Sequence, residues 1–370
     1  MTDVMYVMSG LGRGGAETML VQLAAGLRAR GLSQHVVCVS ALDTLAADLR
    51  AAGVDVTILG AESPASLPRA MATLVRMVKR LRPRILQGWM YHGNIAATLA
   101  HCLCAGRRDR KLIWNLRASN MDETRYGRII RLGALLSRLP NLVIANSEAG
   151  VAFHRARGFR PKSFVVIDNG IDTQKFRPDT AMRKQVRAEL GIAEDALVVI
   201  HVARVDPMKD HTSFLAAMAQ LPSVTGVLVG DGTERLPAPP NVHALGLRRD
   251  TERLYAAADV VASTSAFGEG FSNVIAEGMS AGLIPVATDV GDARRIVGQA
   301  GFIVPPRDSE AFARAVGGVA SLARDEFARR AASARDRIVS NFSLDSAIDR
   351  YWHLYSASPC RVGRADRLTS

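Results

Sequence analysis

The stretch Met5-Tyr-Val-Met8-Ser-Gly10-Leu-Gly-Arg-Gly-Gly15-Ala-Glu17 joins a short apolar run to a glycine-rich turn. A short apolar run is typical of a strand that is buried in a parallel sheet. Beyond the turn, Leu20, Leu23 and Leu27 recur at the spacing of one helix face. Gly31 ends that pattern. A strand, a tight turn and a helix begin a βαβ unit, so this stretch predicts the α/β class.

The same alternation of apolar runs and helical stretches continues along the chain and predicts two parallel sheets. A polar segment at residues 169–178 interrupts it and predicts a link between two domains. Open parallel sheets bind ligands at the carboxyl ends of their strands, so we expect the site in a cleft between the domains. The expected strands are Met5–Met8, His35–Val39, Val54–Leu59, Ile85–Gly88, Leu112–Asn115, Leu142–Ala145, Phe164–Ile167, Leu197–Val202, Val224–Val229, Val242–Leu245, Val260–Ser263, Ile284–Ala287 and Phe302–Val304.

Length and charge narrow the class of protein further. The chain has 370 residues, of which 48% are hydrophobic, which suits two globular domains and excludes a disordered protein. The formal net charge is +12. Residues 1–172 contain 23 Lys and Arg against 12 Asp and Glu, whereas the remainder contains 24 against 23. The first half is therefore basic, which favours phosphate, nucleic acid or anionic lipid as its partner.

Several features together predict a cytoplasmic protein. The four cysteines, Cys38, Cys102, Cys104 and Cys360, match neither a disulfide framework nor a zinc site, which favours a reducing compartment. We find no export signal and no run of the roughly 20 apolar residues that a membrane span needs. A long helical stretch is expected over Asp308–Val339 and a last amphipathic helix over Leu344–Tyr355. Residues 358–370 have no periodicity, so we expect a disordered tail.

The glycine turn allows two interpretations. Gly10, Gly12 and Gly15 satisfy the G-x-G-x-x-G pattern of dinucleotide-binding proteins, whose helix N-terminus holds a pyrophosphate. Such a site also has an acidic residue at the end of the second strand, and this chain has none before Asp43. The alternative is a glycine turn that serves only close packing of the helix.

Two cations follow the first strand of the second half. Arg204 lies just beyond the strand, and Lys209 stands where the next helix is expected to start, after Pro207. Their charges and the helix dipole could together hold a diphosphate. The alternative for such a pair is an ordinary solvated loop.

The most specific motif is Phe267-Gly-Glu269-Gly270-Phe271-Ser272-Asn273-Val-Ile-Ala-Glu277, in which seven residues separate two glutamates. Ser272 is a candidate N-cap for a helix that starts at Asn273. The backbone N–H groups of Gly270, Phe271 and Ser272 could then bind a diphosphate, and the carboxylates could accept hydrogen bonds from sugar and ribose hydroxyls. Acidic residues that merely complement the helix dipole would explain Glu269 well and Glu277 poorly.

Taken in order, these motifs resemble the retaining family 4 glycosyltransferases of the GT-B fold. The resemblance rests on Gly14-Gly-Ala-Glu17, Ala145-Asn-Ser147, Asn169-Gly-Ile-Asp172, Arg204 with Lys209, Gly230-Asp-Gly232 and the two-glutamate block, and it covers residues 4–356. It implies two Rossmann-like α/β domains that face each other across a cleft. It also implies an acceptor-binding domain at 1–170, a nucleotide-sugar domain at 171–340, and a helix at 341–357 that crosses back to the first domain.

The resemblance implies roles for single residues as well. Arg204 and Lys209 would stabilise the departing diphosphate, Glu269 would hold the transferred sugar, and Glu277 would hold the ribose. The other donor-binding residues that it implies are Gly14, Gly15, Leu247 in the turn beside the base, Gly270, Phe271, Ser272 and Asn273. Many relatives carry a catalytic histidine where this chain has Leu116-Arg117, so Arg117 or the nearby His92 is expected to take that part.

The resemblance implies a reaction that moves a sugar from a nucleotide-sugar donor, a UDP-hexose or UDP-N-acetylhexosamine, to an acceptor hydroxyl with retention of configuration. No Asp-x-Asp pair is present, and fixed cations can replace a metal, so we expect neither a metal nor a cofactor. A lipid-linked acceptor of polysaccharide or cell-envelope synthesis would suit the basic first half. The competing hypothesis from another class is an NAD-binding Rossmann oxidoreductase.

The basic helices of the first half raise the question of a membrane or nucleic-acid partner. Leu67–Leu81 and Tyr126–Leu139 mix basic and apolar residues, as interfacial helices do, which predicts peripheral contact with an anionic membrane on its inner face. A core-facing helix with a solvated basic face is the alternative. No aromatic platform accompanies the basic residues near Arg76–Arg84, so nucleic acid is not an expected partner.

Overall fold

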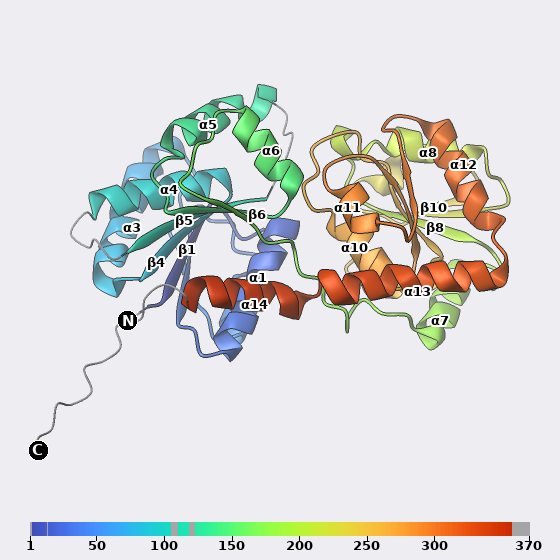
Figure 1. Cartoon of the computed structure of the whole chain (residues 1–370), viewed down its shortest axis with the longest axis horizontal. Coiled ribbons are helices and arrows are strands. Elements are labelled where there is room, and N and C mark those ends of the chain that lie inside the picture. Colours follow the sequence, from blue (N-terminus) through green and yellow to red (C-terminus); the bar gives the residue numbers. More distant parts are fainter. Residues whose placement is uncertain (1, 13, 105–109, 118–122, 357–370) are drawn as a thin grey trace, which may run out of the picture.

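The computed structural model of the chain contains two parallel sheets, each covered by helices (Figure 1). It describes residues 2–12, 14–104, 110–117 and 123–356. The predicted tail at 358–370 lies outside these residues. The first sheet has the order β3-β2-β1-β4-β5-β6-β7 and the second has the order β10-β9-β8-β11-β12-β13. The α/β class and the GT-B arrangement of two Rossmann-like domains are thereby confirmed.

The strands lie where the apolar runs predicted them, each within one residue at either end. This accuracy follows from burial, since strands covered on both faces must be apolar throughout. In the first sheet the strands are β1 (Val4–Met8), β2 (Gln34–Cys38), β3 (Asp55–Ile58), β4 (Ile85–Trp89), β5 (Lys111–Leu116), β6 (Leu142–Ala145) and β7 (Phe164–Val166). In the second they are β8 (Val198–Val202), β9 (Thr225–Val229), β10 (Val242–Ala244), β11 (Val260–Ser263), β12 (Ile284–Thr288) and β13 (Phe302–Val304).

Helices on each face bury the apolar side chains of the sheets in separate clusters. On the first sheet, α3, α4 and α5 cover one face, and α1, α2 and α14 cover the other. The helices are α1 (Gly15–Ala29), α2 (Ala46–Ala51), α3 (Leu67–Leu81), α4 (Met90–Leu103), α5 (Glu123–Leu136), α6 (Glu148–Ala156), α7 (Thr180–Leu190), α8 (His211–Ala219), α9 (Thr251–Ala257), α10 (Asn273–Ser280), α11 (Ala293–Val297), α12 (Ser309–Ala320), α13 (Arg324–Asn341) and α14 (Leu344–Ser356).

The prediction of one long helix over Asp308–Val339 is wrong, because α12 ends before α13 begins. The Ser321 hydroxyl donates to the carbonyl of Gly317 over 3.0 Å, and the Leu322 N–H bonds to Val319 three residues back. These contacts close the last turn of α12. Ala323 is then extended, with φ −60° and ψ 147°, which turns the chain before α13.

The last helix joins the two sheets. In Figure 1, α13 runs along the second sheet's helices and α14 continues beneath the first sheet. Tyr351 and Tyr355 of α14 are fully buried, and the Tyr355 hydroxyl donates to Gln87 of β4 over 2.6 Å. A Cβ on Gly26 of α1 would lie 2.2 Å from Ile348, so only glycine lets α14 pack this closely. The helix expected near 341–357 therefore lies on the first sheet, while the domain limits of 170 and 340 stay predictions.

Both sheets reverse their strand order at one point, and that point is the usual ligand site in open α/β sheets. In the first sheet the reversal falls between β1 and β4, and in the second between β8 and β11. The segments that follow these four strands carry the glycine turn, His92, Arg204 and Glu269. The topology thus places most of the predicted site residues at the two switch points.

Candidate active site

Lys209 and Glu269 meet at the switch point of the second sheet. Lys209 ends a short turn at Pro207–Lys209, after β8, and Glu269 lies in the loop after β11. Their side chains form an ion pair, and both are largely buried. The Ser265 hydroxyl also donates to Glu269 Oε1 over 2.8 Å. The carboxylate is therefore fixed in place and held as a hydrogen-bond acceptor.

Arg204 lies beside this pair and faces solvent. Its side chain is 65% exposed and contacts Asp206 over 3.1 Å. Desolvation raises the pKa of Asp206, but the Met208 N–H and the Arg204 guanidinium outweigh it and hold that pKa below its usual value. Asp206 also caps the turn that carries Lys209, with Met208 N–H donating to it over 3.0 Å. One ionised carboxylate thus positions both cations.

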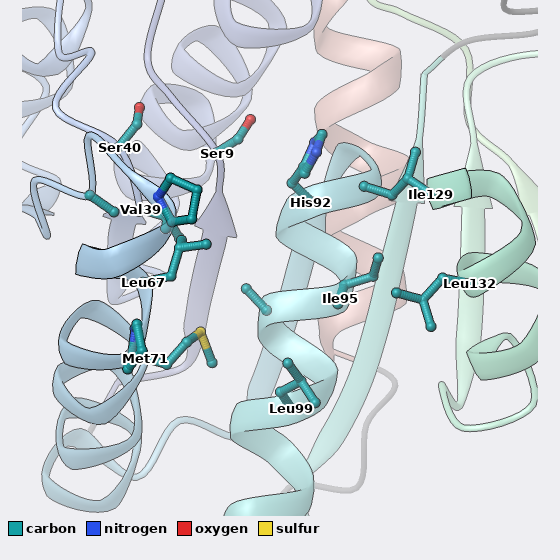
Figure 2. Close-up of a pocket in the computed structure, with 14 residues that line it drawn as sticks. Ser9, Val39, Ser40, Leu67, Met71, His92, Ile95, Leu99, Ile129 and Leu132 are labelled. Carbon is teal, nitrogen blue, oxygen red and sulfur yellow. The ribbon is translucent and has the colours of Figure 1, made fainter. Parts of the chain in front are cut away.

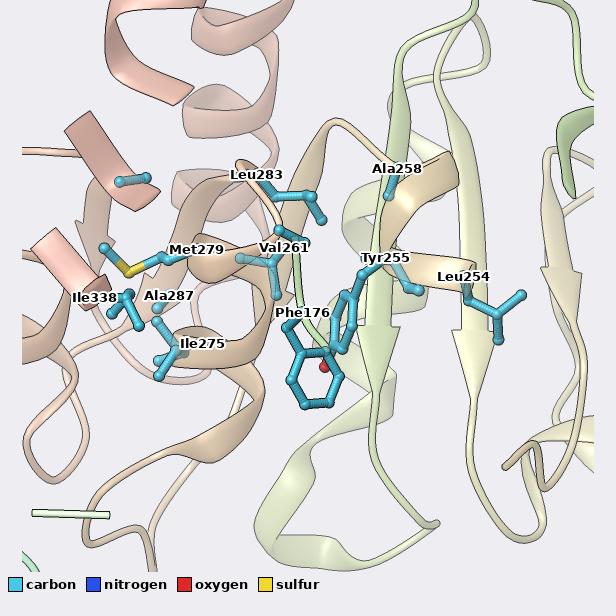
Figure 3. Packing of buried hydrophobic residues seen from close by; sticks show 14 of the residues in the cluster. Phe176, Leu254, Tyr255, Ala258, Val261, Ile275, Met279, Leu283, Ala287 and Ile338 are labelled. Atoms are coloured by element: carbon cyan, nitrogen blue, oxygen red, sulfur yellow. The ribbon is translucent and has the colours of Figure 1, made fainter. Parts of the chain in front are cut away.

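Glu277 lies in a separate, more apolar environment. It is on α10, and the Tyr255 hydroxyl donates to its carboxylate over 3.3 Å. Figure 3 shows Tyr255 in the core of the second domain beside Phe176, whose ring centroid is 5.8 Å away. Burial raises the pKa of Glu277 to about 7, partly offset by the Tyr255 hydrogen bond and by Lys175. Glu269 is paired with a cation, whereas Glu277 is bonded to a tyrosine hydroxyl in an apolar environment, so the two carboxylates are suited to different groups of a ligand.

The N-termini of α1 and α10 lie against each other across the two domains. A Cβ on Gly15, the first residue of α1, would lie 3.1 Å from the side-chain amide of Asn273, the first residue of α10. Both helix ends carry positive partial charge and unpaired N–H groups, which suits a shared anion. The predicted start of α10 at Asn273 is confirmed, and Ser272 is its N-cap residue. Its hydroxyl, however, makes no capping hydrogen bond, so the predicted cap is wrong in that respect.

The loop before α10 makes close contact with the first domain. A Cβ on Gly270 would lie 2.9 Å from the Ser147 hydroxyl, so a larger residue would separate these loops. The Phe271 ring is buried against Phe342, at a centroid distance of 5.4 Å. Phe271 can therefore reach a ligand with its backbone, while its side chain serves the core.

Glu17 belongs to the Gly14-Gly-Ala-Glu17 motif but was not among the predicted site residues. Its side chain folds back over Gly14, where an added Cβ would lie 2.3 Å from Oε2. Burial raises its pKa, and the charges of Arg117 and Arg204 partly offset that rise. Arg117 follows β5 of the first sheet, and Arg204 follows β8 of the second. Glu17 is therefore close to cations of both domains.

Arg117 is the centre of a buried polar network. Its guanidinium donates to the side chains of Asn115, over 2.9 Å, and Asn169, over 2.5 Å, and to the Tyr351 hydroxyl over 3.2 Å. It also stacks on Trp89, 4.2 Å from the ring centroid. This environment makes Arg117 a positioning residue between the first sheet, the linker and α14. Its predicted catalytic part stays a prediction.

His92 lies in the first turn of α4, at the end of β4, and is exposed. The preceding Met90 adopts φ +64°, a left-handed conformation that is strained for a residue with a side chain. Gly93 packs against β1, since a Cβ there would lie 2.3 Å from the Val7 carbonyl oxygen. This strained junction places His92 at the switch point of the first sheet. His92 also lines a pocket of the first domain.

Leu247, predicted to lie beside the donor's base, is in a turn that follows β10. It is 67% exposed and follows Gly246, whose φ of +66° suits glycine. The Gly246 carbonyl accepts a hydrogen bond from Gly230 N–H over 2.8 Å, and Gly230 packs on the backbone that leads to Arg204. The turn at 246–247 is therefore tied to the cation loop through the Gly230 turn.

Among the described residues, no group of three or more His, Cys, Asp or Glu side chains is placed to hold a metal ion. Likewise, no helix within the described ranges is long and apolar enough to cross a membrane.

Comparison with known families identifies the class of protein. Residues 196–321 match the family described as Glycosyl transferases group 1, and residues 13–175 match Glycosyltransferase Family 4. Together the two matches span most of the chain. The chain belongs to the group 1, family 4 glycosyltransferases. The competing hypothesis of an NAD-binding oxidoreductase is not supported by these matches.

Curated relatives match over part of their length. The putative glycosyltransferase EpsD of Bacillus subtilis is 28% identical over 235 residues, which are 58% of this chain and 60% of that protein. A D-inositol 3-phosphate glycosyltransferase of Geodermatophilus obscurus is 31% identical over 240 residues, which are 57% of this chain and 51% of that protein. The chain thus spans about half the length of the curated relatives that it matches.

Solved structures match over almost the whole chain. Anabaena Alr3699/HepE in complex with UDP-glucose has a TM-score of 0.85 at 25% identity and covers 96% of this chain and 100% of its own. WaaG, a glycosyltransferase involved in lipopolysaccharide biosynthesis, has a TM-score of 0.70 at 14% identity and covers 95% of this chain and 99% of its own. The second likeness concerns the fold alone.

Proposed function

We propose that the protein transfers a sugar from a UDP-sugar, a hexose or an N-acetylhexosamine, to an acceptor hydroxyl with retention of configuration. The observation that carries this proposal is the Lys209–Glu269 pair at the switch point of the second sheet, next to the paired N-termini of α1 and α10. A similar structure, Alr3699/HepE, binds UDP-glucose, which supports the choice of nucleotide.

The donor would lie along the second domain's edge. Its base would contact the turn at Leu247 and its ribose the carboxylate of Glu277. Its diphosphate would lie between Arg204, Lys209 and the helix N-termini, and Glu269 would accept hydrogen bonds from the transferred sugar. The backbone of residues 270–273, with Gly14 and Gly15 opposite, would complete the anion site.

In the reaction, the bond between the anomeric carbon and the diphosphate oxygen breaks, and the acceptor oxygen bonds to that carbon from the same face. The acceptor's proton goes to an oxygen of the leaving diphosphate. Arg204 and Lys209 stabilise the growing negative charge. Glu269 is ion-paired and accepts a hydrogen bond from Ser265, which makes it a poor nucleophile and a good anchor for hydroxyls.

No metal is required in this proposal, because fixed positive groups supply the charge that a divalent ion would otherwise supply. The acceptor would bind at the first sheet, where His92 stands at the carboxyl end of β4. It would be a lipid-linked saccharide of polysaccharide or cell-envelope synthesis, reached from the cytoplasmic face of the membrane.

Exposed groups on the first domain support membrane contact. Leu132 and Leu135 of α5 are 43% and 76% exposed. Exposed basic residues lie on the same helix and on α3. They are Arg128 and Arg131 on α5, and Arg69, Arg76, Lys79 and Arg80 on α3. At the same time α3 buries Leu74 and Met77, so the core-facing alternative holds for its inner face. Apolar and basic groups together are the features of a peripheral membrane surface.

A donor screen tests the proposal. UDP-, GDP- and ADP-sugars are added singly, and the midpoint of thermal unfolding is measured, since a ligand that binds the native state raises it. We expect stabilisation by UDP and UDP-sugars and release of UDP when an acceptor is present. If no nucleotide sugar stabilises the protein, or if NAD alone does, the proposal is wrong. Sedimentation with phosphatidylglycerol vesicles tests the membrane contact, which we expect at low salt and not at high salt.

A further inference from the structure

The first domain contains a large apolar pocket that the donor site does not use. Its volume is about 780 Å³, within the range of sites that enclose a small organic ligand. Its walls come from the start of α3 and from α4 and α5 (Figure 2). The lining residues are Ser9, Val39, Ser40, Ala61, Pro64, Leu67, Pro68, Met71, His92, Ile95, Ala96, Leu99, Ile129 and Leu132.

The pocket is polar at one end and apolar along the rest. Figure 2 shows Ser9, Ser40 and His92 together at one end. These residues follow β1, β2 and β4, so the polar end lies at the carboxyl edge of the first sheet, where the acceptor hydroxyl is expected. Beyond them the walls carry Ile95 and Leu99 on α4, with other aliphatic groups opposite. This gradient matches a molecule with a polar head and a hydrocarbon tail.

The apolar surface continues past the pocket on the same helix faces. Leu103 lies one turn beyond Leu99 on α4 and is 64% exposed. On α5, Leu135 lies one turn beyond Leu132 and is 76% exposed. Residues one helical turn apart share a face, so both rows lead away from the polar end. From His92 to Leu103 the path is about 17 Å at 1.5 Å per residue.

Charge on the helices around the pocket favours an anionic lipid surface. The helices that form the pocket walls expose Arg76 on α3 and Arg128 and Arg131 on α5. Aliphatic side chains beside arginines suit an interface where hydrocarbon meets anionic head groups. A compact apolar ligand would explain the volume, but neither the gradient nor the exposed rows.

We infer that this pocket holds a single hydrocarbon chain of the acceptor, with the acceptor's polar head at Ser9, Ser40 and His92. The inference rests on the proposed transferase function and deepens it, because it assigns the acceptor to the amphiphiles and locates its tail. The tail enters from the membrane side along Leu103 and Leu135. The head then lies at the switch point of the first sheet and faces the donor.

Direct binding of a probe tests this without any donor. Dansyl-labelled undecanoic acid is titrated into the full chain, and the rise in fluorescence on entering an apolar site is measured. Octyl and dodecyl phosphate then compete for the site. Each buried methylene should tighten competition about threefold to fourfold, so dodecyl phosphate should compete far better than octyl phosphate. No rise in fluorescence, or equal competition by the two phosphates, would overturn the inference.

Matched variants locate the site. Leu99→Glu places a carboxylate in the apolar wall, and Val339→Glu places one on the exposed face of α13, away from the pocket and from both rows of exposed leucines. Both positions are exposed, so both variants should fold. We expect at least tenfold weaker probe binding for Leu99→Glu and for the pocket-filling Ile95→Trp, and less than a twofold change for Val339→Glu. Equal binding by all three would contradict the assignment.

Stabilisation by UDP is measured on the same preparations, which keeps the two proposals apart. A protein that binds UDP but not the dansyl probe overturns the pocket assignment and leaves the transferase proposal intact. A protein that binds the probe but no nucleotide overturns the transferase proposal, and with it the acceptor's part in the pocket. For Ile95→Trp, retained UDP stabilisation also shows that the variant is folded.

Discussion

The side-chain amide of Asn169 donates a 2.6 Å hydrogen bond to the side-chain oxygen of Asn273. Asn169 belongs to the segment that leaves the first sheet, and Asn273 begins α10. Asn169 also accepts the 2.5 Å hydrogen bond from Arg117. A continuous polar path therefore runs from the first sheet to the N-terminus of the helix that carries Glu277.

Removing this bond should impair catalysis as well as folding, because Asn169→Ala also takes an acceptor from the buried Arg117 guanidinium. In Asn169→Ala the alignment of α10 with the first domain loses one hydrogen bond of about 1 kcal/mol, equivalent to about fivefold in rate. We expect kcat/KM for the UDP-sugar to fall about fivefold to tenfold. Asn341→Ala, an exposed asparagine on α13, is the control and should keep its activity. Equal activity of the two variants would show that the bond has no part in alignment.

The Lys209–Glu269 pair predicts a charge requirement. In Lys209→Met the leaving diphosphate loses a fixed cation, and Glu269 loses its partner. We expect kcat to fall about 100-fold, the usual order for losing one preorganised charge-stabilising group. Arg235→Met, which removes a cation that is 85% exposed, should change kcat less than twofold. A Lys209→Met enzyme within threefold of wild type would remove lysine from the mechanism.

Metal independence is tested by chelation. Because Arg204, Lys209 and two helix N-termini supply the positive charge, transfer should proceed at an unchanged rate in EDTA. Initial rates are compared in EDTA alone and after adding Mg²⁺ or Mn²⁺ in excess. Loss of activity in EDTA with recovery on adding either ion would contradict the proposal.

The raised pKa of Glu277 predicts that the protein releases a proton when it binds UDP. Its pKa is about 7 in the folded protein, raised from 4.5 mainly by burial. Ribose hydroxyls donate to the ionised carboxylate, so binding should lower this pKa and release a proton near pH 6. Calorimetry in buffers of different ionisation enthalpy counts that proton. Titration of UDP itself contributes equally in Glu277→Gln, so the difference between the two proteins should be up to one proton near pH 6 and zero at pH 9.

The same raised pKa fixes the sign of a stability effect. Between pH 4.5 and about 7 the folded state binds more protons at Glu277 than the unfolded state does. The contribution of Glu277 to the free energy of unfolding therefore decreases as the pH rises from 4.5 to about 7, and it stays constant at higher pH. Chemical unfolding of wild type and Glu277→Gln at pH 5 and pH 8 measures the difference. A wild type that gains stability relative to Glu277→Gln on going to pH 8 would contradict the assignment.

The sequence predicted the strands well, because burial on both faces leaves an uninterrupted apolar run. It also identified Lys209, Glu269 and Glu277 as site residues. It could not show that Lys209 contacts Glu269, since 60 residues separate them and only the pairing of β8 with β11 brings their loops together. That contact depends on the topology of the sheet, and a local sequence pattern carries no information about topology.

Residues whose partners are distant were the ones that sequence reasoning missed or left open. Asp292 accepts hydrogen bonds from the N–H groups of Glu148 and Ala149, at 3.0 and 2.9 Å, and thereby caps α6 from the other domain. Nothing in its local sequence signals this. The apolar pocket was equally hidden, because its walls come from three helices whose inner residues look like ordinary core positions.

Arg117 provides the test that separates a positioning role from a catalytic one. Its guanidinium is buried and contacts Asn115, Asn169 and Tyr351. In Arg117→Met these acceptors lose their donor, which should destabilise the protein by about 2–4 kcal/mol. The unfolding midpoint should fall, and kcat/KM should fall with it because Asn169 is no longer held.

Arg117→Lys and His92→Ala complete the comparison. Lysine restores the charge but cannot make three forked contacts, so we expect partial recovery of stability and activity together. His92 is exposed, so His92→Ala should keep the unfolding midpoint and lower kcat if the imidazole orients the acceptor hydroxyl. A catalytic arginine would behave differently, with Arg117→Lys as stable as wild type and still inactive. That result, with an active His92→Ala enzyme, would transfer the acceptor-side role from His92 to Arg117.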